Sequence, residues 1–175
     1  MPVILCLPLS IQQAIWSHLL AGEDEQCESA AFAFAKHVER EAVHSFECVD
    51  WYAVPVEGFE IRSGYHIELT DEIRATVIKR AHDLNASVVE FHSHLGPWPA
   101  QFSPSDRMGL AEFVPHVRWR LRGRPYLAVV TTRTDFDGLA WVADSSGPVR
   151  LDGINLDDRL ILPTGLSSLE YQDDN

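Results

Sequence analysis

The chain has 175 residues, a net charge of −12, 46% hydrophobic and 23% charged residues, which predicts one globular domain over residues 1–175. The negative charge argues against nucleic acid as the main partner, because phosphate would be repelled. The apolar N-terminal stretch is too short for a signal peptide or a membrane span, so we expect a cytoplasmic protein with no membrane partner.

The first half of the chain predicts strands, one helix and an acidic loop. In chain order, we expect a strand at 3–8, a helix at 10–20, the loop at 22–26 and strands at 46–55 and 65–69. Residues 28–42 are rich in Ala, Glu and Lys, which favour a helix. However, Ala30, Phe32 and Phe34 alternate with smaller residues, as in a strand packed on both faces.

The second half predicts a similar mixture. Thr70 or Asp71 caps a helix that runs to about Leu84. Its inner face is predicted to hold Ile73, Val77, Ile78 and Ala81. After it we expect a strand at 87–91, a helix opened by Pro104, strands at 126–132 and 138–143 with a hairpin turn at 135–138, and a frayed acidic tail at 172–175. Pro115 should end or kink the second helix. This order predicts an α/β fold with a mixed sheet flanked by helices.

Two histidines follow the predicted strand at 87–91 and have the spacing of metal ligands. Residues two apart on a strand share a face, so His92 and His94 can direct their imidazoles at one ion. Asp106 lies near the start of the next helix and can supply a carboxylate oxygen. Two imidazoles and one carboxylate leave a fourth position for water, which is typical of a catalytic zinc site.

Each half of this pattern also has a simpler explanation. A lone His-x-His on a strand is usually a surface or packed pair. Ser103, Pro104 and Asp106 form a capping-box-like helix start that needs no metal. These two explanations leave the order and closeness of the segments unexplained. A metal site accounts for both the order and the closeness, because a helix N-terminus docked at a strand end brings Asp106 to the histidines.

The pattern His-Ser-His followed by Ser-x-x-Asp resembles the signature of the JAMM metallopeptidases, the MPN-domain family that includes deubiquitinases. The resemblance implies that His92, His94 and Asp106 bind Zn²⁺ and that Ser103 helps to hold the tetrahedral intermediate. Eight residues instead of seven separate His94 from Ser103, and Leu95 replaces the usual proline. The intervening loop contains two prolines, and we expect it to absorb the extra residue.

The family also has a glutamate upstream, at the start of a strand. Glu28, before the Ala/Phe alternation, matches that place and is our candidate for the general base, with Glu25 and Glu23 as alternatives. The resemblance covers about residues 28–135. It implies the MPN fold, a three-layer arrangement similar to that of cytidine deaminase.

The resemblance implies a zinc-dependent isopeptidase that cleaves after the C-terminal tail of a ubiquitin-like protein. The compact chain is similar to stand-alone bacterial JAB proteins of ubiquitin-like conjugation and antiphage defence systems. The acidic balance suits a ubiquitin-like partner with an arginine-bearing tail. Processing of a sulfur-carrier protein of the ubiquitin fold, or a non-catalytic MPN scaffold, are the alternatives. The sequence leaves the oligomeric state open.

Other polar features have no assigned role in this interpretation. The basic stretch at 118–124 is most simply a cationic helix end. The remaining histidines lack paired spacing and are expected to be surface or hydrogen-bonded residues: His18, His37, His44, His66, His82 and His116. Cys6, Cys27 and Cys48 fit reduced, mostly buried thiols.

Overall fold

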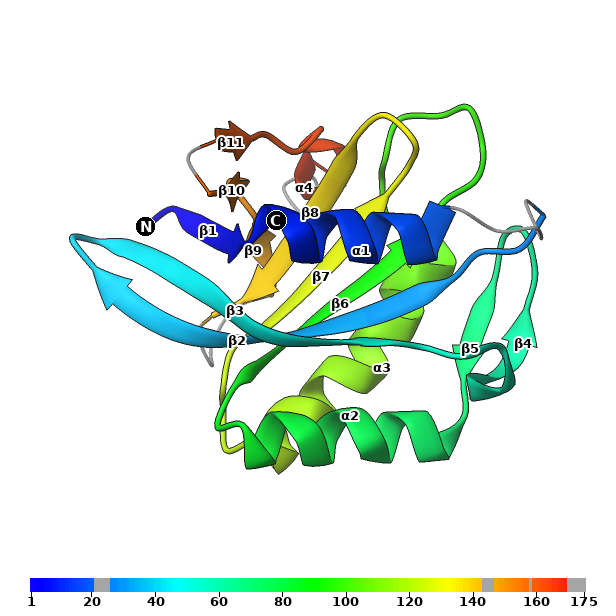
Figure 1. Cartoon of the computed structure of the whole chain (residues 1–175), viewed down its shortest axis with the longest axis horizontal. Helices are drawn as coiled ribbons and strands as arrows, with labels where there is room; N and C mark the ends of the chain where they lie inside the picture. The colour runs from blue at the N-terminus through cyan, green and yellow to red at the C-terminus, as the bar shows by residue number, and fades with distance from the viewer. Residues whose placement is uncertain (21–25, 143–146, 158, 170–175) are drawn as a thin grey trace.

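The computed structural model describes residues 1–20, 26–142, 147–157 and 159–169. Within them, the strands of the main sheet are β1 Val3–Leu7, β2 Ala30–Arg40, β3 Val43–Ala53, β6 Ser87–Ser93, β7 Tyr126–Thr131, β8 Phe136–Trp141, β9 Val149–Arg150, β10 Gly153–Leu156 and β11 Arg159–Ile161. Their order across this nine-stranded sheet is β11-β10-β1-β3-β2-β6-β7-β8-β9 (Figure 1). A separate two-stranded sheet pairs β4 Phe59–Arg62 with β5 Ile67–Leu69.

The main sheet mixes parallel and antiparallel pairs. The strand β1 runs parallel to β10 and β3, and β6 runs parallel to β7. The central strand β2 is antiparallel to both of its neighbours, β3 and β6. The sequence-based prediction of an α/β fold with a mixed sheet flanked by helices is therefore confirmed.

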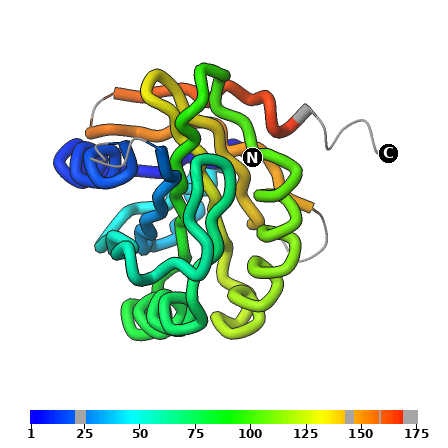
Figure 2. The backbone as a smooth tube through the Cα atoms, turned by 90° about the vertical axis from the view of Figure 1, so that its right-hand side faces the viewer, coloured from blue at the N-terminus to red at the C-terminus, as the bar shows by residue number. Residues whose placement is uncertain are grey.

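Helices cover both faces of the sheet. The helices are α1 Leu9–Leu20, α2 Asp71–Asp83, α3 Pro104–Arg120 and the short α4 Leu166–Leu169, with a 3₁₀ turn at Val56–Gly58. One core layer joins α2 and α3 to the sheet, and a second core layer joins α1 to the other face. Figure 2 shows α1 and α3 at opposite sides of the molecule.

The strand β2 explains why helix propensity fails in this region. Ala30, Phe32 and Phe34 enter the core beneath α2 and α3, whereas Ala31, Ala33 and Ala35 enter the core beneath α1. Every residue from 30 to 35 is buried. Pairing on both edges and burial on both faces outweigh the weak local preference for helix.

The helix α2 agrees with its prediction. Thr70 is the N-cap, and its hydroxyl accepts the backbone N–H of Ile73. The buried residues of this helix are the four predicted ones, Ile73, Val77, Ile78 and Ala81.

Two chain breaks differ from their predictions. Pro115 was expected to end or kink α3, and the helix does not end there but continues to Arg120. Pro115 is exposed, and the buried residues Val114 and Val117 hold the helix to the sheet on both sides of it. Proline interrupts only the local hydrogen bonding, and packing outweighs that loss.

The turn between β7 and β8 lies earlier than the predicted 135–138, because β8 already begins at Phe136. Thr132 N–H donates to the Asp135 carbonyl at 2.9 Å, and the Thr132 hydroxyl donates to the Asp135 carboxylate at 2.6 Å. These bonds close the turn before the Asp-Gly pair is reached.

Two predicted strands have other bounds in the structure, and two predicted acidic segments fall wholly or mostly outside the described residues. The strand expected at 46–55 begins at residue 43, and the strand expected at 65–69 contains only 67–69. The acidic tail at 172–175 and most of the loop at 22–26 lie outside the described residues. The three cysteines are free thiols of intermediate burial. Among the described helices, none combines the length and apolarity needed to cross a membrane.

Candidate metal centre

The strand β6 and the residues just beyond it place both histidines. In the sheet, β6 lies between β2 and β7, and His92 is opposite Ala30 on one side and Val130 on the other. His94 follows the strand, and its backbone N–H donates to the Thr131 carbonyl at 2.8 Å. The two imidazole rings lie 5.0 Å apart between centroids. The end of a central strand therefore holds both side chains near one point.

Asp106 comes to the histidines through the start of α3. Ser103 is the N-cap of this helix, and its hydroxyl accepts the Asp106 N–H at 3.1 Å. In return, Asp106 Oδ2 accepts the Ser103 N–H at 2.7 Å. This reciprocal capping box fixes the carboxylate at the third position of the helix.

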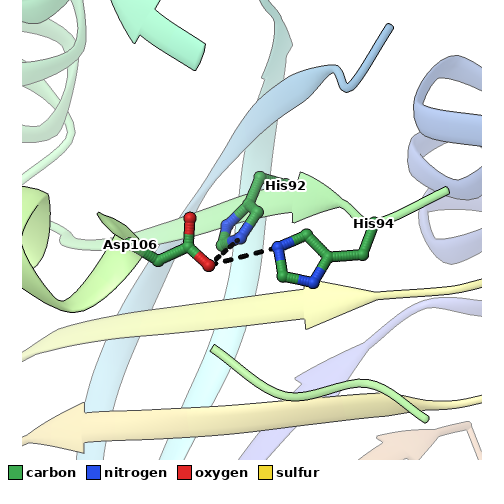
Figure 3. Close-up of side chains that lie close together, drawn as sticks. All are labelled: His92, His94 and Asp106. Carbon is green, nitrogen blue, oxygen red and sulfur yellow. Dashed lines mark hydrogen bonds and ion pairs between the residues drawn. The ribbon is translucent and has the colours of Figure 1, made fainter. Parts of the chain in front are cut away.

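The three side chains converge, as Figure 3 shows. Asp106 Oδ2 lies 3.1 Å from His94 Nε2 and 3.4 Å from His92 Nε2. One ligand atom from each residue can be chosen so that all three lie within 4.8 Å of one another. This group could hold a metal ion.

The donor set fits zinc in type and in spacing. Two ligand atoms bound at about 2.0–2.1 Å to a tetrahedral zinc are about 3.3–3.4 Å apart, close to the observed separations. His92 Nε2 is also a buried nitrogen that, among the described residues, makes no hydrogen bond. An unsatisfied buried nitrogen is costly, and a metal ion would satisfy it.

The loop from Leu95 to Phe102 joins the histidines to the start of α3. Its end is fixed, because Ala100 N–H donates to Asp135 Oδ1 and Phe102 N–H donates to Ser167 Oγ, both at 3.0 Å. Its middle is exposed, with Trp98 at 78% relative exposure. The hydrogen bonds at Ala100 and Phe102 thus fix the chain just before the helix start.

Glu28 is buried beside the three ligand candidates. Its Oε1 lies 3.9 Å from His94 Nε2, so its carboxylate faces the centre as the sequence predicts. The hairpin formed by β4 and β5 holds its backbone from both sides. Glu28 N–H donates to the Ser63 carbonyl at 2.7 Å, and Arg62 Nε donates to the Glu28 carbonyl at 3.0 Å. The alternatives Glu23 and Glu25 lie outside the described residues.

The charges in the centre are strongly perturbed. Burial raises the pKa of Glu28, although the nearby histidines oppose the shift. Burial also disfavours the Asp106 carboxylate, but the adjacent His92 and His94 and the hydrogen bonding of Ser103 hold its pKa well below the usual range. Asp106 therefore stays anionic as a ligand must, and Glu28 is a stronger base than an exposed glutamate.

Ser103 lies one residue before the start of α3, beside the carboxylate of Asp106. Its hydroxyl oxygen accepts the Asp106 N–H at 3.1 Å, and a side-chain hydrogen bond of Ser103 contributes to the lowered pKa of Asp106. These contacts with Asp106 hold the hydroxyl at the centre.

A cavity of about 450 Å³ opens beside the centre. Its walls come from β5 and α3, and His92 and Asp106 line it together with Glu90. Two hydrogen-bonded groups border this cavity. His66 is 3.0 Å from both the Ser105 hydroxyl and Glu68 Oε1, and the Tyr126 hydroxyl donates to Glu90.

The contacts around the ligand candidates come from residues that were given no part in the site. His66 is hydrogen-bonded, as one of the two expectations for it had it, but its position between the hairpin and the start of α3 was not foreseen. Arg62 and Ser63 were not identified at all, although they hold Glu28. These residues are 34 to 39 positions from their partners, and no local spacing indicates the docking of the hairpin.

Comparisons with known proteins give little. No protein-family model matches the chain, and no curated protein matches it. One matching structure is the solution structure of protein DSY2949 from Desulfitobacterium hafniense, with 14% sequence identity, a TM-score of 0.49, and coverage of 90% of this chain and 94% of that chain. This likeness carries no argument about function.

Proposed function

We propose that this protein is a JAMM-type zinc isopeptidase of the MPN fold, which cleaves after the C-terminal tail of a ubiquitin-like protein. The observation that carries the proposal is the convergence of His92, His94 and Asp106, with the Glu28 carboxylate 3.9 Å from His94 Nε2. The segment that leads into β2, the end of β6 and the capped start of α3 contribute to one centre, in the chain order of the JAMM signature.

In this proposal His92, His94 and Asp106 hold the zinc ion. The ion would act as a Lewis acid that brings the pKa of water to about 7. Glu28 accepts a proton from the water that attacks the carbonyl carbon, and it delivers that proton to the leaving amine as the C–N bond breaks. The Ser103 hydroxyl donates a hydrogen bond to the carbonyl oxygen while negative charge develops on it.

The charge of the cavity supports a substrate with a basic tail. Glu68, Glu90 and Glu112 line the cavity beside Asp106, and Arg74 is the arginine among them. A tail that carries arginine beside the reacting carbonyl would be attracted by these carboxylates.

The test is cleavage of ubiquitin-like fusion proteins by zinc-loaded protein, with and without chelator. We expect cleavage that chelator abolishes and added zinc restores. A fusion that ends in Gly-Gly before its extension would report precursor processing, and an isopeptide-linked conjugate would report deconjugation. Zinc-bound protein that cleaves neither substrate would contradict an enzymatic role and leave a scaffold.

A further inference from the structure

Glu28 lies just outside the hydrogen bonding of the main sheet. The strand β2 begins at Ala30, and one residue earlier the Ser29 carbonyl still accepts an N–H from the end of β6 at 3.0 Å. The N–H and the carbonyl of Glu28 are instead bonded to the hairpin formed by β4 and β5. The sheet therefore positions the histidines, whereas the hairpin positions the carboxylate that faces them.

The turn of the hairpin fits closely against the chain just before Glu28. A Cβ added at Gly64 would lie 2.5 Å from the Gln26 carbonyl oxygen, so even a methyl group there would force the two segments apart. Ser63 closes the same turn. Its N–H donates to the His66 carbonyl at 2.9 Å, and its hydroxyl bonds both the carbonyl and the N–H of His66 at 3.0 Å.

The side chain of His66 connects this turn to the start of α3. Its Nδ1 lies 3.0 Å from the Ser105 hydroxyl, and its Nε2 lies 3.0 Å from Glu68 Oε1. A carboxylate can only accept the Nε2 proton, so in the neutral ring Nδ1 accepts the proton of Ser105. Ser105 directly precedes the ligand candidate Asp106. The hairpin thus contacts both the segment that holds Glu28 and the segment that holds a ligand.

The position of the hairpin depends on such contacts. A two-stranded hairpin is at best marginally stable by itself. At its base, Phe59, Ile67 and Leu69 pack against the core. At its turn, hydrogen bonds join it to Glu28 on one side and to α3 on the other. The place of the Glu28 carboxylate therefore depends on a contact that Glu28 does not itself make.

We propose that His66 is a positioning residue, which holds the hairpin against α3 and so sets the distance from the Glu28 carboxylate to the metal ligands. The assignment rests on the proposed function, in which Glu28 is the general base. A base must lie within about 2.6–3.2 Å of the group whose proton it accepts. Misplacement by about 1 Å can lower the rate about 100-fold. The loss of His66 therefore affects the chemical step more than it affects zinc or substrate binding.

Amide hydrogen exchange followed by NMR tests the hold on Glu28 without any activity. In chelator-treated, full-length protein, we expect His66→Ala to speed exchange of the Glu28 N–H about three- to tenfold, the worth of about one hydrogen bond. Gly64→Ala should speed it as well, because the added methyl group separates the turn from the chain before Glu28. Tyr65 has 82% relative exposure at the same turn, so Tyr65→Ala is the matched control and should leave the exchange unchanged.

Kinetics of the zinc-loaded variants separate positioning from other roles. We expect His66→Ala to lower kcat about 10- to 100-fold, with zinc content and KM unchanged. Asparagine has an amide oxygen near the place of Nδ1 and can accept the Ser105 proton, so His66→Asn should restore kcat to within about threefold of wild type. Glutamine reaches the place of Nε2 and keeps only the bond to Glu68, so His66→Gln should remain as slow as His66→Ala.

Three outcomes overturn the assignment. The first is unchanged exchange of the Glu28 N–H in both His66→Ala and Gly64→Ala. The second is equal kcat in His66→Asn and His66→Gln. The third is a raised KM with normal kcat in His66→Ala, which would assign His66 to substrate binding. Faster exchange at Glu28 in a protein that cleaves no fusion would refute the isopeptidase proposal and leave the hold of the hairpin on Glu28 intact.

Discussion

The protein contains two close pairs of histidines in very different surroundings. His37 and His44 stack across β2 and β3 with ring centroids 5.2 Å apart, and one ring nitrogen bonds the other at 3.0 Å. His92 and His94 are as close, at 5.0 Å, but both direct Nε2 toward Asp106. The first pair forms a hydrogen bond within itself, whereas the second pair shares a carboxylate.

The difference shows that two adjacent imidazoles do not define a metal centre. At the first pair a nitrogen lone pair is used by the neighbouring ring, and within the described part of the chain no third ligand joins it. At the second pair His92 Nε2 is buried and, among the described residues, makes no hydrogen bond, and Asp106 supplies a third ligand candidate. The third ligand and the unsatisfied nitrogen distinguish the candidate centre.

Removal of each histidine pair tests most directly whether only one of them binds metal. We expect His92→Ala/His94→Ala to lower bound zinc from about one ion per chain to almost none, because a single carboxylate holds zinc weakly. The matched His37→Ala/His44→Ala variant should keep all of its zinc. Inductively coupled plasma mass spectrometry measures both. Equal zinc loss in the two variants would remove the distinction.

A carboxylate lies near each pair, and its replacement tests whether only one of the two acts as a base. Glu28→Gln should lower kcat by a factor of about 100 to 10,000 with zinc content and folding unchanged, since glutamine cannot accept a proton. Glu39 faces His44 across the strands and provides the control. Glu39→Gln should leave kcat normal. Turnover at the wild-type rate in the Glu28 variant would refute its role as general base.

Two helices begin with a hydroxyl N-cap. Ser103 caps α3 at the centre, and Thr70 caps α2 away from it. Ser103→Ala and Thr70→Ala should each lower the free energy of unfolding by about 0.5–2 kcal/mol. Only Ser103→Ala should also lower kcat, by about 100-fold, with zinc retained. Urea unfolding and steady-state kinetics separate the two effects. Parallel losses in both variants would reduce Ser103 to a cap.

Replacement of a single histidine should change the free energy of unfolding of chelator-treated protein only slightly, and the change should depend on pH. Burial lowers the pKa of His92, but Asp106 and the neighbouring glutamates raise it to a net value above 6.5. Its stabilising contribution is complete below about pH 6.5 and is lost as pH rises through the raised pKa. Burial and His44 lower the pKa of His37, so stability rises as pH approaches 6.5.

Removal of each histidine should therefore have opposite effects on the pH profile. In measurements from about pH 5.5 to 8, the wild-type protein should lose free energy of unfolding relative to His92→Gln once pH rises above about 6.5. Relative to His37→Gln, it should gain free energy of unfolding as pH rises. Urea unfolding across this range measures both slopes. Slopes of the same sign would contradict the assigned pKa directions.

The sequence predicts those features that depend on short-range patterns. The helix α2 is evident from the cap at Thr70 and the periodic apolar face, and the structure reproduces both. The ligand candidates could be predicted because they lie in two local patterns. One is the spacing of the two histidines at a strand end, and the other is the capping box that contains Asp106. The turn at Thr132–Asp135 escaped prediction, since side-chain hydrogen bonds close it before the Asp-Gly pair.

Contacts between distant segments were beyond the same reasoning. The bonds from Arg62 and Ser63 to Glu28 depend on how the hairpin docks, and nothing in its sequence specifies that position. Likewise, Pro115 is tolerated only because the sheet holds the helix on both sides. Both cases require knowledge of the tertiary packing.

The carboxylate of Asp106 belongs at once to the helix cap and to the ligand group, through the same oxygen. An ion that binds only the folded protein stabilises it by about 2.7 kcal/mol at a free concentration one hundred times its Kd. An ion held by this ligand group would bring that stabilisation directly to the first turn of α3. Resistance of this helix to proteolysis should therefore report the amount of free metal, and the protein would act as an indicator of its own loading.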